Sequence, residues 1–140
     1  MSKVYSELVY HFVWATRDRL ALITPEVQVH LLPFLETKCR EEGYLLHAVN
    51  CVDDHVHLLV TLRPRDSVPD VAKKLKGSSS HFINKELKLG GILYWQRGYS
   101  VVTLAKRDIP AVAEYIRRQE DHHQGDGKVI ADLERVGPSG

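Results

Sequence analysis

The chain has 140 residues, 44% of them hydrophobic and 26% charged, with a formal net charge of +1; this is typical of one globular domain and excludes a disordered chain. The apolar runs are too short for a transmembrane helix, and Glu7 and His11 interrupt the apolar stretch at the start, which excludes a signal peptide. We therefore expect a cytoplasmic protein with no membrane contact. Cys39 and Cys51 are too few for a disulfide scaffold or a cysteine-rich zinc site, so we expect buried thiols.

The small net charge hides two basic segments. Residues 63–88 carry seven Lys and Arg against three Asp and Glu, and residues 97–118 carry five against two. A basic face of this kind can bind a polyanion such as a nucleic acid. Two solvated helix faces explain the same pattern, and charge alone leaves both interpretations open.

The first third of the chain predicts a strand and a helix. Residues 4–16 are rich in β-branched and aromatic types with alternating apolar side chains, which is typical of a strand. Thr24 is a suitable N-cap and Pro25 a suitable first residue for the helix that follows. We expect this helix to end near Gly43 and to be kinked or shortened by Pro33.

The middle of the chain predicts a hairpin, a second helix and a further strand. Residues 44–52 and 55–62 are expected to pair as two strands joined by a tight turn. Apolar residues three to four apart predict a helix over residues 68–87. Residues 92–104 are strand-like, and Gly98 within them indicates a bulge or bend.

A last helix completes the predicted elements. Asp108 is its expected N-cap, Pro110 lies in its first turn, and it runs to about Gln124. Residues 1–124 then form one domain and residues 125–140 a C-terminal tail. The order β-α-β-β-α-β followed by a helix predicts an α+β fold: a ferredoxin-like antiparallel sheet with an additional C-terminal helix.

The strand over residues 55–62 carries two histidines on one face. Side chains alternate across a strand, so the core face takes the apolar residues Val56, Leu58, Val60 and Leu62. His55 and His57 share the opposite face, roughly 7 Å apart, where two imidazoles can bind one divalent metal. The H-x-H pattern alone is weak evidence, because eight histidines in 140 residues produce it by chance about half the time.

The last helix brings a tyrosine and an amide together. Tyr115 and Gln119 are four residues apart and therefore share one helix face. At this spacing they can supply a nucleophile and a further metal ligand. An ordinary amphipathic position, with a packed ring and a hydrated hydroxyl, also explains Tyr115.

Two further segments have the chemistry of a nucleic-acid surface. Lysine side chains neutralise phosphates and serine hydroxyls bond to phosphate oxygens, and the second helix offers Lys73, Lys74, Lys76 and Ser78. A solubilising helix face is the alternative. Arg97 lies between Trp95 and Tyr99, whose rings can stack on bases or simply belong to the core.

Together these segments resemble the single-tyrosine HUH transposases of small bacterial insertion sequences, including their repeat-associated relatives. The matching stretches cover about residues 4–124 in the family's order: VYHFVWATRDR, DDHVHLLV, KKLKGSSSHFIN, YWQRGYSVVTL and EYIRRQEDHH. The resemblance implies a ferredoxin-like fold, an obligate homodimer and cleavage of single-stranded DNA with hairpin ends. It also implies a 5′-phosphotyrosine intermediate through which DNA is cut and rejoined.

The resemblance implies a role for each site residue. Tyr115 matches the family's nucleophile. His55 and His57 match its metal-binding pair, and Gln119 matches its third metal ligand. Asp54 matches a residue that frequently precedes the first histidine. Two imidazoles alone favour a transition metal such as zinc, whereas the resemblance implies Mg²⁺ or Mn²⁺. We follow the resemblance, because the amide and substrate oxygens are harder ligands. The resemblance further implies that Tyr115 of one chain can serve the histidine pair of its partner.

Two other functions stay open. One is a domesticated, non-mobile DNA-hairpin-binding protein of the same family, in which the basic helix matters and Tyr115 is idle. The other is a histidine-triad phosphohydrolase, which needs a third alternating histidine where this chain has Leu59.

Overall fold

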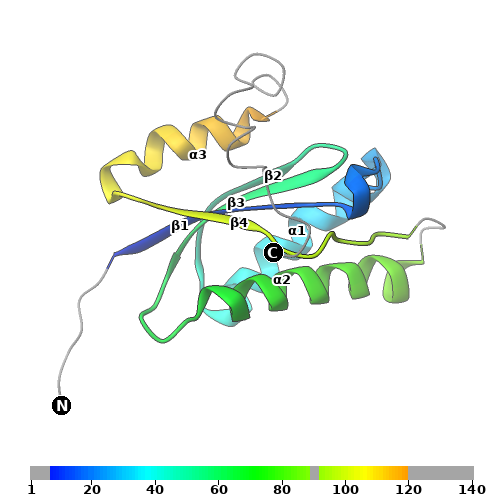
Figure 1. Cartoon of the computed structure of the whole chain (residues 1–140), viewed down its shortest axis with the longest axis horizontal. Helices are drawn as coiled ribbons and strands as arrows, with labels where there is room; N and C mark the ends of the chain where they lie inside the picture. The colour runs from blue at the N-terminus through cyan, green and yellow to red at the C-terminus, as the bar shows by residue number, and fades with distance from the viewer. Residues whose placement is uncertain (1–6, 89–91, 120–140) are drawn as a thin grey trace.

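The computed structural model describes residues 7–88 and 92–119. Its regular elements follow the predicted order (Figure 1): β1 (Leu8–Ala15), α1 (Pro25–Glu42), β2 (Leu45–Cys51), β3 (His55–Leu62), α2 (Val68–His81), β4 (Ser100–Leu104) and α3 (Ile109–Arg117). None of the described helices is both long enough and apolar enough to cross a membrane.

The strands form one sheet in the order β2-β3-β1-β4, with every neighbouring pair antiparallel. Helices α1 and α2 lie on one face of this sheet, and α3 lies on the other (Figure 1). This arrangement confirms the predicted α+β fold with a ferredoxin-like strand order. The additional helix α3 makes the protein three layers thick.

The main core lies between the sheet and the pair α1 and α2. Phe12 and Trp14 of β1 stand opposite Leu58 and Val56 of β3, which confirms the predicted apolar face. The helices bury Leu31, Leu35, Val71 and Leu75 against it. Cys39 and Cys51 are buried thiols, as expected, and burial raises the pKa of Cys39 to about 12.

Helix α1 has the predicted ends and is not shortened at Pro33. The Thr24 hydroxyl accepts a hydrogen bond from the Val27 amide at 3.2 Å, and Gly43 ends the helix with a left-handed φ of 82°. The helix continues through Pro33, so the expected shortening is wrong. Pro33 cannot bond to the Val29 carbonyl four residues back, but both residues are exposed, so water can solvate that carbonyl.

The segment before β4 is the second difference from the sequence prediction. Only Ser100–Leu104 pairs with β1, whereas residues 92–99 make one isolated bridge, between Trp95 and Thr16. Gly98 is buried with a φ of 86°, and this left-handed turn takes the chain out of the sheet. The Trp95 ring packs edge-on against Trp14, 5.9 Å between centroids, so Trp95 belongs to the core.

The ends of the last two helices also differ from the predictions. Helix α2 continues to Leu87 only through a wider π-helical segment, Phe82–Leu87. Asp108 is the N-cap residue of α3, as predicted, but it lies at the end of a 3-10 turn, Lys106–Asp108, with φ −88° and ψ −6°, and its side chain makes no capping hydrogen bond. Helix α3 ends at Arg117, followed by the non-helical C-cap residue Arg118 (φ −106°, ψ 29°), so it is shorter than the predicted run to about Gln124. The tail 125–140 lies outside the described residues.

Candidate active site

The two histidines of β3 lie on the face that α3 covers. His55 and His57 are both fully buried, and their rings meet edge to face with centroids 5.1 Å apart. They share this face with Leu59, whose partners include Ala113 and Ile116 of α3. The predicted sharing of one face is therefore confirmed, and α3 encloses it.

Asp54 holds the first histidine. Its Oδ1 lies 2.7 Å from Nδ1 of His55, and its Oδ2 accepts a hydrogen bond from Nε of Arg19 at 3.3 Å. A carboxylate at Nδ1 favours the tautomer with the proton there, which leaves the lone pair on Nε2. The role of Asp54 beside a bound metal, which the resemblance implies, stays a prediction.

A third histidine, His11 of β1, holds the second one. His11 Nε2 lies 2.9 Å from Nδ1 of His57, and the ring centroids are 5.0 Å apart. His11 is only 3% exposed, and burial, with a smaller contribution from His57, lowers its pKa to about 3.

Sequence analysis did not single out His11 as a site residue. The available signal was its parity: in β1 it alternates with Tyr10, Phe12 and Trp14, so it falls on the face opposite the main core. Which residue of β3 it would meet depends on the strand register, which no local pattern specifies.

Helix α3 packs onto this face through its apolar side. Ala113 and Ile116 are buried against Val9, Ala48 and Leu59, and Tyr115 packs beside them. The Tyr115 hydroxyl oxygen is buried, so the interpretation of a hydrated hydroxyl does not hold.

The C-terminal end of α3 is fixed to β2 beside the histidines. Asn50, the cross-strand partner of His57, donates two hydrogen bonds of 3.0 Å, to the carbonyl oxygens of Ile116 and Arg117. These are carbonyls that a helix end leaves without internal partners. Asn50 therefore connects the strand pair that carries His57 to the helix that carries Tyr115. Sequence analysis did not identify it, because its partners are backbone atoms far along the chain.

Gln119 has a buried polar side chain that no described residue satisfies. Its side chain is fully buried, yet neither Oε1 nor Nε2 has a hydrogen-bond partner within the described part of the chain. A buried polar group without a partner costs about 1–3 kcal/mol. Such groups are retained where an ion, a water or a substrate satisfies them.

The donor set fits a divalent metal. In residues 7–88 and 92–119, no three His, Cys, Asp or Glu side chains are arranged as a metal site. Two imidazoles and one amide are a different set: His55 Nε2, His57 Nε2 and Gln119 Oε1 are all buried on the α3 side of the sheet. Two of these donors have their orientation fixed by a second group, which is typical of metal-binding histidines.

Comparison with known proteins gives the family. The model of the family described as "Transposase IS200 like" matches residues 4–119. The chain belongs to this family. The ISDra2 transposase TnpA of Deinococcus radiodurans is 28% identical over 120 residues, which are 82% of this chain and 86% of the relative. The transposase for insertion sequence element IS200 of Salmonella typhimurium is 29% identical over 115 residues, which are 79% of this chain and 75% of the relative.

Solved structures share the fold. A crystal structure described as a transposase from Deinococcus radiodurans R1 matches with a TM-score of 0.63 and 29% identity, over 85% of this chain and 98% of that one. A REP-associated tyrosine transposase bound to a REP hairpin matches with a TM-score of 0.63 and 18% identity, over 88% of this chain and 73% of that one. The resemblance to transposases of small insertion sequences is thus confirmed.

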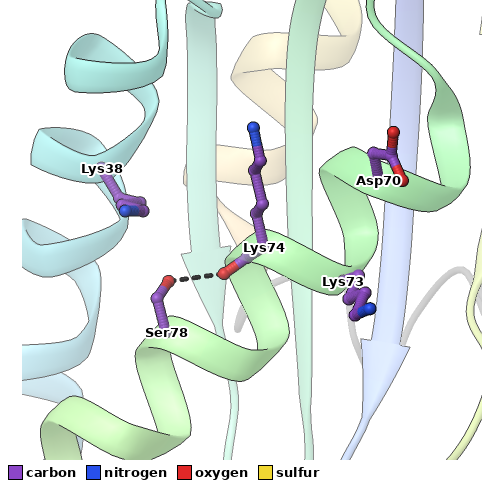
Figure 2. A pocket seen from close by; sticks show the side chains of 5 residues that line it. All are labelled: Lys38, Asp70, Lys73, Lys74 and Ser78. Atoms are coloured by element: carbon purple, nitrogen blue, oxygen red, sulfur yellow. Dashed lines mark hydrogen bonds between the residues drawn. The ribbon is translucent and has the colours of Figure 1, made fainter.

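In this IS200-like transposase, Lys73 and Lys74, which were expected to contact DNA, lie away from the histidines. Figure 2 shows a pocket between α1 and α2, lined by Lys38, Asp70, Lys73, Lys74 and Ser78. Lys74 donates to Glu42 Oε1 at 3.1 Å, and Lys38 lies 3.3 Å from Glu42 Oε2. These contacts, with Lys74 first, lower the pKa of Glu42. The pocket lies on the α1 and α2 side of the sheet, whereas His55 and His57 lie on the α3 side.

Two other residues expected to contact DNA differ in their surroundings. Lys76 Nζ donates to the carbonyl oxygens of Gln96 and Gly98, at 2.8 and 2.9 Å, and burial lowers its pKa. Lys76 therefore connects α2 to the loop before β4. Arg97, in that loop, is exposed.

Proposed function

We propose that this transposase cuts and rejoins single-stranded DNA through a covalent bond between Tyr115 and a 5′-phosphate. We further propose that His55, His57 and Gln119 hold a divalent metal, Mg²⁺ or Mn²⁺. The observation that carries the proposal is the buried amide of Gln119, which has no hydrogen-bond partner among the described residues and lies two residues beyond α3, the helix that covers the face of the two histidines. We also propose DNA with hairpin ends as the substrate and the cytoplasm as the place where the protein acts.

Tyr115 supplies the attacking atom. Its phenol oxygen bonds to the scissile phosphorus while the bond from phosphorus to the 3′-oxygen breaks. The phenol proton is lost and the departing oxygen gains one, so the products are a 5′-phosphotyrosine and a free 3′-hydroxyl. Because the phosphodiester bond energy is kept in this link, a 3′-hydroxyl can reverse the step and join new ends.

The remaining site residues prepare this step. A free tyrosine hydroxyl titrates near pH 10, so at neutral pH its attack needs a polarised phosphate. A divalent ion, when bound, draws charge from the phosphate oxygens and orients them. The packing of α3 and the two hydrogen bonds from Asn50 hold Tyr115 in place, and burial of the hydroxyl excludes competing water.

The first test is a covalent-adduct assay with an oligonucleotide whose cleaved strand diffuses away. Wild-type protein should form an adduct that survives denaturing electrophoresis. Tyr115→Phe should form none while binding the same DNA nearly normally, since it lacks one oxygen. An adduct of undiminished yield in Tyr115→Phe would exclude Tyr115 as the nucleophile. DNA binding by wild type with no adduct on any substrate would favour the hairpin-binding alternative.

The metal is tested separately. Thorough chelation should abolish the adduct, and added Mn²⁺ or Mg²⁺ should restore it. His57→Ala should lose cleavage, and excess Mn²⁺ should restore part of it. Wild-type cleavage that persists after chelation would contradict the metal role and leave the Tyr115 assignment intact.

A further inference from the structure

Two buried imidazoles share one hydrogen bond at the site. His11 Nε2 and His57 Nδ1 lie 2.9 Å apart, and both side chains are shielded from solvent. A nitrogen pair this close is bridged by one proton, which one ring donates and the other accepts. The position of that proton decides the tautomer of His57.

Only one of the two placements suits a metal ligand. With the proton on Nδ1, a neutral His57 keeps the lone pair on Nε2. With the proton on His11 Nε2, His57 accepts through Nδ1 and carries its own proton on Nε2, where it then cannot bind a metal. The tautomer of a histidine ligand is set by the hydrogen bond at its other nitrogen.

We propose that His11 is a positioning residue: it accepts the hydrogen bond from His57 Nδ1 and so keeps the Nε2 lone pair of His57 directed to the metal. This inference rests on the proposed metal set. His11 takes the role for His57 that the Asp54 carboxylate takes for His55, whose Nδ1 is 2.7 Å from Asp54 Oδ1. Each histidine of the pair thus has an acceptor at its Nδ1.

The strand register fixes this contact. Val13 is the cross-strand partner of His57 and Leu59 that of His11, so the two histidines are diagonal neighbours on one face. Both lie in regular strands of the central pair β1 and β3, away from the edges of the sheet. The backbone therefore holds the two rings in place before any metal binds.

The tautomer can be measured without metal or DNA. We would label histidine with ¹⁵N and record long-range ¹H–¹⁵N spectra of the metal-free protein. Wild-type His57 should carry its proton on Nδ1. In His11→Phe, which fills the ring volume without an acceptor, that preference should be lost. In His11→Gln, whose amide oxygen can occupy the place of Nε2, it should return. A wild-type His57 with its proton on Nε2 would overturn the proposal, as would an unchanged tautomer in His11→Phe.

A second measurement is the affinity for Mn²⁺ alone, by electron paramagnetic resonance. His11→Phe should bind Mn²⁺ about tenfold or more weakly than wild type, and His11→Gln should recover most of the loss. Val71→Ala is the control for a general loss of stability, since Val71 is buried in the main core on the opposite face of the sheet, and it should leave the affinity unchanged. Equal weakening in Val71→Ala and His11→Phe would overturn the proposal in favour of a purely structural role.

The tautomer measurement tests the role of His11, and the Mn²⁺ affinity of wild type tests the proposed metal set. Failure of wild type to bind Mn²⁺ would contradict the proposed metal set, while the tautomer of His57 in the metal-free protein still decides the role of His11. If His11→Phe does not fold, the wild-type tautomer and the His11→Gln variant decide it instead.

Discussion

Asp54 connects the histidine pair to a strained turn. Its carboxylate contacts His55 Nδ1 through one oxygen and Arg19 Nε through the other. Arg19 and the preceding Asp18 both have left-handed φ angles, 57° and 56°, which cost non-glycine residues about 1–2 kcal/mol each. Strain of this kind persists where surrounding contacts stabilise the strained conformation. Here the contact is between Arg19 and Asp54, and Asp54 also contacts His55, a proposed metal ligand.

A carboxylate in this position predicts a graded response to substitution. Asp54→Ala removes the acceptor at His55 Nδ1 and should weaken Mn²⁺ binding by about 10–100-fold. Asp54→Asn keeps an acceptor oxygen without the charge, so it should lose less. Titration calorimetry with Mn²⁺ measures both. Asp53→Ala is the control, because Asp53 is exposed and accepts a hydrogen bond from the Ile23 amide through its backbone carbonyl, which the substitution keeps. Equal loss in Asp53→Ala and Asp54→Ala would contradict a specific role for Asp54.

At the scale of the elements, the lysines of α2 differ: some are exposed to solvent, and one binds a neighbouring loop. Lys73 is exposed, whereas Lys76 is half-buried and holds two carbonyl oxygens of the loop before β4. Hydrogen bonds from a charged group each stabilise a protein by about 1.5–3 kcal/mol. The loop also carries Trp95, whose indole nitrogen donates to Ser79 Oγ of the same helix at 3.0 Å.

Lys76→Ala should therefore lower the free energy of unfolding by about 2 kcal/mol, because it leaves the carbonyls of Gln96 and Gly98 without their donor. Lys73→Ala should change it by no more than about 0.5 kcal/mol. Urea denaturation of both variants checks this. An unchanged stability in Lys76→Ala would mean that water replaces the amine and would contradict a structural role for Lys76.

Local periodicity predicted most of these elements, and alternation in residues 55–62 placed both histidines on one face. The spacing of Tyr115 and Gln119 predicted one shared helix, whereas α3 ends at Arg117 and Gln119 follows the non-helical C-cap residue Arg118. The contacts of His11 and Asn50 could not be predicted, because both depend on the register between strands that are far apart in sequence. Lys76 was assigned to a polar helix face for the same reason: its carbonyl partners come from a loop twenty residues later.

The errors in the elements came from context that propensity does not contain. Pro33 interrupts a helix only where the missing hydrogen bond matters, and here the carbonyl concerned is exposed to solvent. Residues 92–99 have strand-like composition, but Trp95 and Tyr99 pack on the core and the left-handed conformation of Gly98 turns the chain away from the sheet. Solvent exposure at Pro33 and tertiary packing in residues 92–99 thus overrode the local preference.

At the scale of the whole molecule, the resemblance predicts a two-fold dimer whose sheets join edge to edge, with Tyr115 of one chain serving the histidines of the other. In the single chain, α3 lies on its own sheet, and a linker of four residues, 105–108, joins it to β4. In a trans arrangement the Asn50 hydrogen bonds would join α3 to the partner's β2.

Mixing two inactive variants tests this arrangement. After exchange of Tyr115→Phe and His57→Ala chains, a trans site unites an intact Tyr115 with an intact histidine pair. Half of the randomly mixed dimers are hybrids with one working site of two, so the adduct yield should recover to about a quarter of wild type. Sedimentation and mass-tagged chains confirm exchange. Complete exchange with no recovered adduct would show that α3 stays on its own sheet.

The sheet also separates the pocket of lysines from the histidines, and this separation sets a condition on DNA length. Layers in a protein lie about 10 Å apart, and successive phosphates of one duplex strand advance about 3.4 Å. A fragment of two or three nucleotides cannot pass round the sheet and touch both surfaces. We expect replacement of Lys73 and Lys74 by alanine to leave the affinity for such fragments unchanged and to weaken a long hairpin, with a smaller salt dependence. Equal effects on both lengths, in a binding titration, would contradict this. By varying the length of the DNA fragment, binding at the histidine site can therefore be measured separately from binding at the lysine pocket.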